Sequence, residues 1–357
     1  MQPAAIWRAR TAVVQRRPRM IRAPKRHKKT RAVMSKVILH IGTHKTGTTT
    51  IQDTFALNRS FLSGKGLVFP EIGKASGQHG LVMDWIKLPE AYHLDTTAQA
   101  AWAKLARDHA KSDRTVLIST EELSRGNPNS RVDMRKLRDM LSDFDEVKVV
   151  CFLRNQISFL QSIYLQVVKS GVNIHWGNFF EGAASSKMAT GLFLDYNDLK
   201  DYLETAFSPE EISFFSYERE ARESHGIIGR MMTECGLPQF AGALKDLPAG
   251  NSNVSPDPLG TWVVAHVLGG RPFKSWLLET ARVALDDIGK DGMKTAIFTK
   301  DEYQRLKDVF GPLNRQFQDR SGGVEIGAFP KEDNVVFRDS LTPAYWVQLS
   351  RRLVDKI

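Results

Sequence analysis

The segment Val37-Ile-Leu-His-Ile-Gly-Thr-His-Lys-Thr-Gly-Thr-Thr-Thr50 decides the fold. It opens with a short apolar run rich in β-branched side chains, which is typical of a buried strand. Gly42 and Gly47 frame a turn, and apolar residues at helical spacing then predict a helix over residues 48 to about 62. This strand–turn–helix order is typical of an α/β unit in which the helix begins where the strand ends.

The rest of the chain alternates strands with helices in the same way. We expect further strands at 67–69, 115–119, 147–153 and 212–215, and helices around 78–88, 97–111, 132–141, from the end of strand 147–153 to 169, and 195–206. Short apolar strands separated by helices imply a parallel sheet that is covered on both faces. The sequence therefore predicts a three-layer α/β fold of the P-loop type. Its C-terminal part, from about residue 224, should be mainly helical, broken by the Pro/Gly/Asn-rich stretch 247–258.

The positive charge of the chain is concentrated at its N-terminus. The 357 residues include 50 Lys and Arg against 40 Asp and Glu, but eleven of the basic residues and none of the acidic ones lie in residues 1–33. We expect this segment to be a disordered basic tail and residues 34–357 to be one domain. Met34 directly precedes the first strand, so it is a candidate for the natural start. A targeting peptide or a polyanion-binding arm is the alternative interpretation of the tail.

Composition narrows the class of protein further. Two distant cysteines, Cys151 and Cys235, exclude a disulfide scaffold and a multi-cysteine zinc site, and they suit a reducing compartment. No run reaches the ~18 apolar residues that a membrane span needs, and arginines interrupt the apolar runs near the N-terminus. We therefore expect a cytoplasmic location, no transmembrane segment, and no nucleic-acid partner for the folded domain.

The glycine turn has the chemistry of a phosphate cradle. Glycines allow the backbone to approach a ligand closely, and a helix N-terminus presents free N–H groups to an anion. In loops that bind nucleoside triphosphates a lysine follows the second glycine, whereas here Thr48 stands in that place and Lys45 precedes Gly47 by two residues. A P-loop kinase or NTPase is therefore the disfavoured alternative.

The run Gly42-Thr-His-Lys-Thr-Gly-Thr-Thr resembles the loop that binds the 5′-phosphosulfate in sulfotransferases using 3′-phosphoadenosine 5′-phosphosulfate (PAPS). The strand–Arg–helix segment 149–162 is similar to the family's 3′-phosphate site. The tyrosine of 214–218 is similar to one that lies near the adenine in this family. The resemblance implies that the donor is bound by Gly42, Thr43, His44, Lys45, Thr46, Gly47, Thr48, Thr49, Thr50, Arg154, Ser162 and Tyr217.

This family resemblance also implies the reaction. A sulfuryl group would pass from PAPS to a hydroxyl or amine by in-line displacement without a metal, leaving 3′-phosphoadenosine 5′-phosphate (PAP), while Lys45 stabilises the departing phosphate. The general base would follow strand 115–119, where Glu121 is the first candidate and Glu122 and His79 are alternatives. His44, inside the loop, is a candidate for contact with the sulfuryl group.

The acceptor is less clearly indicated. Segments 251–255 and 314–317 resemble the bacterial branch that acts on carbohydrates, which favours a carbohydrate or glycolipid over another small molecule. Trp176 is a candidate for stacking on a sugar. Two features depart from cytosolic members of the family: Thr50 replaces the usual adenine-stacking aromatic, and only Arg271 or Arg320 could represent their basic C-terminal phosphate loop.

Overall fold

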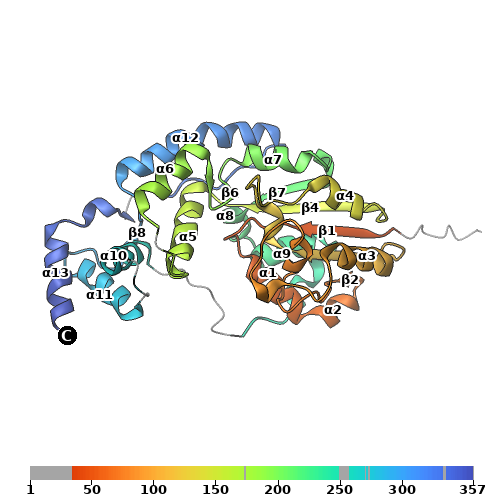
Figure 1. Ribbon diagram of the computed structural model, residues 1–357, viewed down its shortest axis with the longest axis horizontal. Helices are drawn as coiled ribbons and strands as arrows, with labels where there is room; N and C mark the ends of the chain where they lie inside the picture. Colours follow the sequence, from red (N-terminus) through yellow and green to blue (C-terminus); the bar gives the residue numbers. More distant parts are fainter. Residues whose placement is uncertain are drawn as a thin grey trace, which may run out of the picture. The chain divides into compact units, whose positions relative to one another are not determined.

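A parallel sheet forms the centre of the molecule (Figure 1). The computed structural model describes residues 34–172, 174–248, 257–269, 271, 274–332 and 335–356. The five strands are β1 (Lys36–His40), β2 (Leu67–Val68), β3 (Thr115–Ser119), β4 (Glu146–Leu153) and β7 (Ile212–Ser216), in the order β2-β3-β1-β4-β7. Every neighbouring pair is parallel. The predicted strands and the parallel sheet are confirmed.

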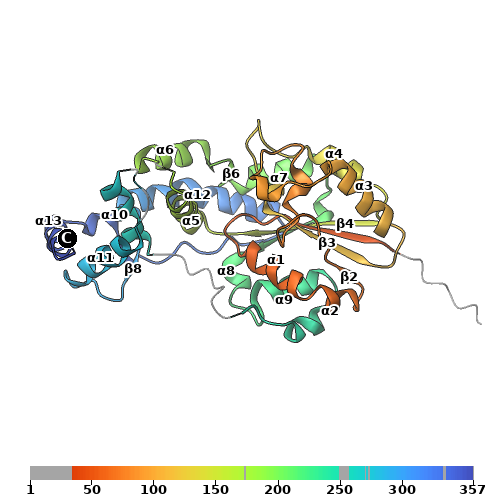
Figure 2. The same cartoon turned by 60° about the horizontal axis from the view of Figure 1, so that its bottom comes forward.

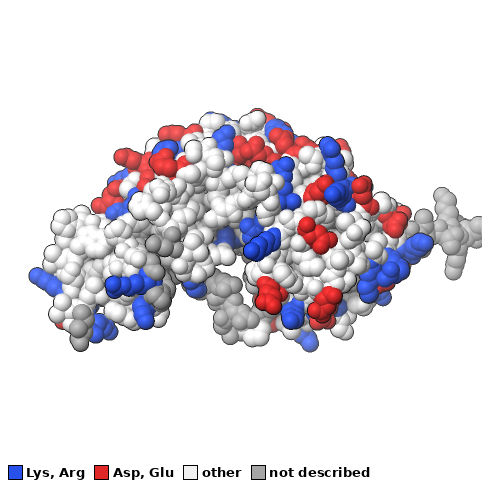
Figure 3. Space-filling model, in the orientation of Figure 1, with Lys and Arg blue, Asp and Glu red and all other residues white. Residues whose placement is uncertain are grey.

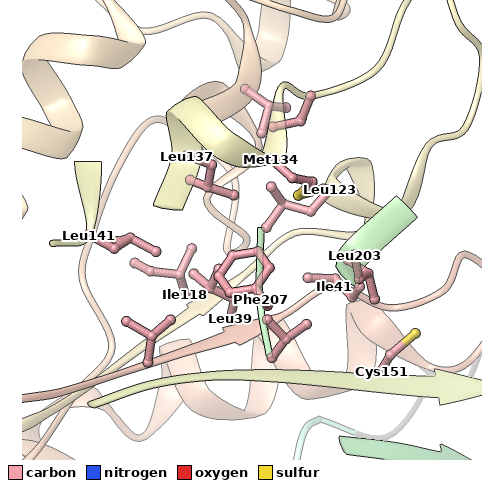
Figure 4. Close-up of a cluster of buried hydrophobic side chains, with 14 of the residues drawn as sticks. Leu39, Ile41, Ile118, Leu123, Met134, Leu137, Leu141, Cys151, Leu203 and Phe207 are labelled. Atoms are coloured by element: carbon pink, nitrogen blue, oxygen red, sulfur yellow. The ribbon is translucent and has the colours of Figure 1, made fainter. Parts of the chain in front are cut away.

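Helices cover both faces of this sheet because successive strand residues point to opposite sides. Val37 and Leu39 of β1 belong to one apolar cluster, and Ile38 belongs to the other. The first cluster packs under α3 (Ala98–His109), α4 (Met134–Met140) and α7 (Tyr196–Glu204). Figure 4 shows Met134 and Leu137 of α4 and Leu203 of α7 in it. The second packs against α1 (Thr48–Leu57), α2 (Arg59–Ser63) and α9 (Gly226–Glu234), on the opposite face in Figure 2. The three-layer prediction is confirmed.

The C-terminal part is mainly helical, as expected. One apolar cluster joins α5 (Gln156–Lys169), α6 (Trp176–Ser186) and α12 (Lys300–Arg320). Another joins α10 (Pro258–Leu268), α11 (Ser275–Asp286) and α13 (Pro343–Val354). Short elements complete the described chain: α8 (Tyr217–Glu220), the strands β5 (Met188–Ala189), β6 (Leu192–Phe193), β8 (Lys294–Thr295) and β9 (Val335–Val336), and 3₁₀ turns at Glu90–Tyr92, Pro209–Glu211, Pro238–Ala243 and Arg338–Ser340.

The single helix predicted over 48–62 is wrong, because the chain breaks at Asn58 between α1 and α2. The Asn58 amide is buried and forms hydrogen bonds in addition to the local backbone ones. Its Nδ2 donates to the carbonyl of Thr54 (2.8 Å) and to that of Lys245 (3.2 Å), while its Oδ1 accepts from the Lys245 N–H (2.8 Å). This side chain thus ties the helix break to a segment 187 residues away.

The helix predicted over 78–88 is also wrong. Only one 3₁₀ turn, η1 (His79–Val82), forms there. The Gln78 side chain accepts from the N–H of Ser119 (2.8 Å) and donates to the carbonyl of Pro70 (2.9 Å). Trp102 Nε1 donates to the carbonyl of Leu81 (2.9 Å). These long-range hydrogen bonds hold the segment against β3 and α3 in a non-helical path.

Residues 1–33 and 251–255 lie outside the described residues, so the predictions for the basic tail and for the first carbohydrate-type segment stay predictions. Within the described chain, no helix combines the length and the apolar character needed to cross a membrane.

We predict that Asn58→Ala lowers the free energy of unfolding by about 1–3 kcal/mol, because the hydrogen bonds of the buried Asn58 amide to Thr54 and Lys245 are lost. Chemical denaturation measures the change. Asn129→Ala is the matched control: Asn129 is exposed and only its backbone N–H is hydrogen-bonded, so its removal should change stability by less than about 0.5 kcal/mol. Equal effects of the two substitutions would contradict the role given to Asn58.

Candidate active site

The loop after β1 is anchored to β4, where the pairing of the two strands continues past the end of β1. The N–H of Thr43 donates to the carbonyl of Phe152 (2.8 Å), and the N–H of Phe152 donates to the carbonyl of Gly42 (2.5 Å). Within the loop, Thr46 Oγ1 donates to the carbonyl of Thr43 (2.6 Å). The sheet therefore fixes the path of the loop at its own C-terminal edge, which is where parallel α/β sheets bind ligands.

Both glycines of the loop are required by geometry. Gly42 has a φ of +88°, and a Cβ placed there would lie 2.9 Å from Cβ of Glu121. Gly47, at the N-terminus of α1, has a φ of +78°, and a Cβ there would lie 2.4 Å from Cδ1 of Ile227. Lys45 also has a left-handed backbone conformation, with a φ of 62°. A non-glycine residue adopts this conformation at a cost, which is typical of functional loops.

The backbone N–H groups of residues 44–50 form no hydrogen bond with any other described residue, and the next N–H, of Ile51, donates to the carbonyl of Gly47 (3.1 Å). Thr46 and Thr48 are nevertheless buried. Backbone donors at buried positions are almost always paired. A row of unpaired N–H groups at a helix N-terminus is an anion-binding site, because the donors and the positive end of the helix dipole act together.

Arg154, at the end of β4, lies at the same site. Its Nη1 donates to the carbonyl of Lys45 (3.0 Å), and its guanidinium carbon lies 5.4 Å from the centre of the Tyr217 ring. Its Nε is buried without a hydrogen-bond partner among the described residues. Tyr217 also approaches Gly47, since a Cβ there would lie 3.7 Å from Tyr217 Cε2. The loop after β1, Arg154 and Tyr217 thus line one site, as the sequence predicts.

Positive charge accumulates there. The pKa of Lys45 is lowered, first by burial and then by the positive charges of Arg154 and Lys169, while the carboxylate of Glu121 opposes the shift. Lys and Arg side chains gather at the hollow in the middle of the face shown in Figure 3. Cations held this close together favour a ligand that carries more than one negative charge.

The start of α5 is fixed beside this site by Asn155. The Asn155 side chain accepts from the N–H of Ser158 (2.9 Å), and its N–H and Nδ2 donate to Oε1 of Glu218 (3.0 and 2.8 Å). Ser162 lies further along α5 and is buried. Its predicted contact with a phosphate stays a prediction.

Glu121 lies next to the loop, at the start of the 3₁₀ turn η3 (Glu121–Ser124) that follows β3. Gln52 Nε2, from α1, donates to Glu121 Oε2 (2.9 Å). His79 Nδ1 lies 3.8 Å from the same oxygen and shares a hydrogen bond with Thr120 Oγ1 (2.9 Å). Two of the three predicted base candidates, Glu121 and His79, are therefore neighbours.

The surroundings of Glu121 keep it ionised. Burial alone would raise its pKa, but the charges of His44 and His79 and the hydrogen bond from Gln52 outweigh burial, and the pKa falls below its ordinary value of 4.5. A carboxylate that is charged near neutral pH can accept a proton, and its lowered pKa makes Glu121 a weaker base than an ordinary glutamate.

Glu122 is occupied by other partners. It forms an ion pair with Arg125 and lies 3.4 Å from His44 Nε2. Burial opposes its ionisation, yet the neighbouring His44 and Arg125 lower its pKa to about 2. Glu122 is therefore better placed to hold His44 in the loop than to accept a proton from a ligand.

Sequence reasoning missed two buried side chains around the site. Gln52 carries no sequence signal of its own, because its partner is distant in the chain. His40, the last residue of β1, shares a hydrogen bond with Ser119 Oγ (2.7 Å), and burial lowers its pKa to about 4, so it is neutral at physiological pH. The apolar run that predicts β1 gives no reason to single it out.

Several weaker candidates have structural partners elsewhere. Arg320 pairs with Asp201, and Arg271 lines a separate cavity beside α10. The Asn314 amide exchanges two hydrogen bonds with the buried Gln156 (2.7 and 3.0 Å). Trp176 is buried against Phe298. Within the described ranges, no cluster of three or more His, Cys, Asp or Glu is arranged to hold a metal ion.

Comparison with known proteins identifies the family. Residues 35–247, more than half of the chain, match the family described as the sulfotransferase domain. The chain therefore belongs to the sulfotransferase family, and the resemblance noted in the loop is confirmed. A solved sulfotransferase from Alicyclobacillus acidocaldarius is similar at 13% identity and a TM-score of 0.43, over 80% of this chain and 95% of that one. The search of curated proteins found no significant match.

We predict that Gly42→Ala lowers the free energy of unfolding by about 2 kcal/mol or more, because the new Cβ is strained at this φ and meets Glu121. Thermal or chemical denaturation measures the loss. Gly182→Ala, in α6 with open space around the new Cβ, is the control and should be neutral or stabilising by about 0.5–1 kcal/mol. A Gly42→Ala protein as stable as the control would show that the close approach to Glu121 is not needed.

Proposed function

We propose that this sulfotransferase takes its sulfuryl group from PAPS and transfers it to a hydroxyl or amine of a carbohydrate or glycolipid acceptor, leaving PAP. The observation that carries this proposal is the row of unpaired N–H groups at 44–50 beside three cations. A donor with phosphates at two ends of an adenosine supplies anions for both the loop and the arginine.

The residues present fit such a donor. The glycine positions leave no room for side chains, and the unpaired N–H groups of the loop suit the 5′-phosphosulfate, together with the hydroxyls of Thr48 and Thr49. We assign the 3′-phosphate to Arg154, whose Nε forms no hydrogen bond with another described residue and lies 4.0 Å from Glu218 Oε1, with Ser162 as the second donor. Tyr217, packed under the guanidinium, is placed for the adenine.

The donor supplies an electrophilic sulfur and a phosphate leaving group. Lys45 extends from the leading side of the loop, where its ammonium stabilises negative charge that develops on the phosphate. The lowered pKa of Lys45 reflects its position among other cations, and an anion at the loop would relieve that repulsion. Arg154 holds the carbonyl of Lys45 and so fixes the lysine backbone.

Glu121 is the general base in this proposal, and His79 and Glu122 are the alternatives. Its carboxylate is ionised and oriented by Gln52, and its Cβ borders Gly42 of the loop. Proton removal from the acceptor would therefore occur next to the cradle that holds the donor. His79, 3.8 Å away, would stabilise the carboxylate before proton transfer.

Other functions are less well supported. A nucleotide kinase needs its lysine where Thr48 stands, and the family match points to sulfuryl transfer instead. A polyanion-binding role would rest on residues 1–33, which the structure does not describe. A cytoplasmic location and reaction without a metal remain part of the proposal.

We predict that Lys45→Ala lowers kcat by about 10²-fold or more with little change in the Kd for PAP, because the ammonium acts on charge that develops during transfer. Arg154→Ala should instead weaken PAP binding at least about tenfold, because a charge-assisted contact is lost. Steady-state kinetics and isothermal titration with PAP separate the two effects.

Lys65→Ala and Arg305→Ala are matched controls, since both cations are exposed and pack on aromatic rings away from the loop. Neither should change kcat or the affinity for PAP. An Arg154→Ala protein that binds PAP as tightly as the wild type would refute the assignment of Arg154.

We predict that Glu121→Gln leaves PAP affinity unchanged and lowers kcat by about 10²- to 10⁴-fold, the contribution of a general base. Glu122→Gln is the comparison, and its main effect should be lower stability, because Arg125 and His44 lose a charged partner. Full activity in Glu121→Gln would transfer the role of base to His79 or Glu122.

A further inference from the structure

A cavity lies beside α5, α6 and α10. Its volume is about 780 Å³, within the range of sites that enclose a small ligand. Tyr164 and Val168, one turn apart on α5, line it. None of the residues that we assign to the donor or to the base lines it, so it is a separate feature of the molecule.

One wall of this cavity is aromatic. Trp262 is half-buried on α10, and the exposed His266 ring is stacked on it, with centres 5.0 Å apart and planes at 9°. The guanidinium of Arg338 lies 5.2 Å from the Trp262 ring and 5.5 Å from that of Trp176. Flat, rigid aromatic faces bind the apolar face of a sugar ring with little loss of side-chain entropy.

The polar groups of the cavity leave an excess of positive charge. Among the described residues that line it, Glu302 is the only carboxylate, and its Oε1 accepts from Trp176 Nε1 (2.9 Å) and from Arg338 Nη2 (2.6 Å). Arg338 Nη1 has no hydrogen-bond partner among the described residues. Arg271, also on the lining, adds a further cation. Since Glu302 is neutralised by Arg338, the cavity favours an anionic ligand.

We infer that this cavity binds a segment of an acidic glycan, a chain of sugars that carries carboxylate or sulfate groups. The inference rests on the proposed carbohydrate acceptor, and it assigns to the cavity a part of the acceptor chain other than the sugar that is sulfated. The exposed ring of His266, backed by Trp262, provides the stacking surface, and Arg271 attracts the acidic groups. Trp176 forms the back of the cavity, because it is buried and its indole N–H is taken by Glu302.

Isothermal titration of the full chain with two tetrasaccharides tests this inference. The acidic probe is unsulfated chondroitin tetrasaccharide, and the neutral probe is cellotetraose. We expect the acidic probe to bind at least about tenfold more tightly than the neutral one. Trp262→Ala should raise the Kd for the acidic probe about tenfold, and His266→Ala, at an exposed position, should raise it severalfold.

Trp276→Ala is the matched control, because Trp276 is exposed on α11 and does not line the cavity. It should leave the Kd for the acidic probe unchanged. Titration with PAP in the same samples reports on folding and on the donor site, and should give one Kd for the wild type and all three variants. Failure to bind PAP would therefore count against the proposed donor, independently of the glycan result.

Three results would overturn the inference. The first is an acidic probe that fails to bind a wild-type protein that binds PAP. The second is equal binding of the acidic and neutral probes. The third is an unchanged Kd for the acidic probe in both Trp262→Ala and His266→Ala.

Discussion

The unpaired N–H groups of residues 44–50 are the constraint on which the rest of the site depends. They are held open because β4 fixes the loop on one side, through the bonds between Phe152 and residues 42 and 43. On the other side, Gly42 lies directly against Glu121, and Gly47 against Ile227. The fold thus supplies a rigid row of donors that only a ligand or water can satisfy.

Charge is distributed around this row in a way that suits group transfer. Arg154 is hydrogen-bonded to the Lys45 carbonyl, and the positive charges of Arg154 and Lys169 act on the Lys45 ammonium. The carboxylates of Glu121 and Glu122 lie near His79 and His44, respectively. Displacement at sulfur needs a cation by the departing phosphate and a base by the acceptor. Gly42 of the loop lies directly against Glu121, so the proposed donor cradle and the proposed base are in contact.

Much of this arrangement was readable from the sequence, because it depends on local pattern. The parallel strands and the glycine turn with Lys45 follow from periodicity and spacing, whereas the arginine at the end of β4 was indicated by the family resemblance. What the sequence did not predict depends on contacts between distant residues. Asn58 breaks a helix by bonding to Lys245, Gln78 holds its segment against β3, and Gln52 orients Glu121.

The hairpin of β5 and β6 escaped prediction for a different reason. Its strands have only two residues each, too few for an alternating pattern to show, and its turn, Thr190-Gly191, lacks the usual asparagine–glycine signal.

The measurement that tests the central claim most directly is a crystal structure with PAP. We predict that the 5′-phosphate accepts hydrogen bonds from the N–H groups of residues 44–50 and that the 3′-phosphate contacts Arg154. Nucleotide bound in another cavity, with these N–H groups facing only water, would contradict the account.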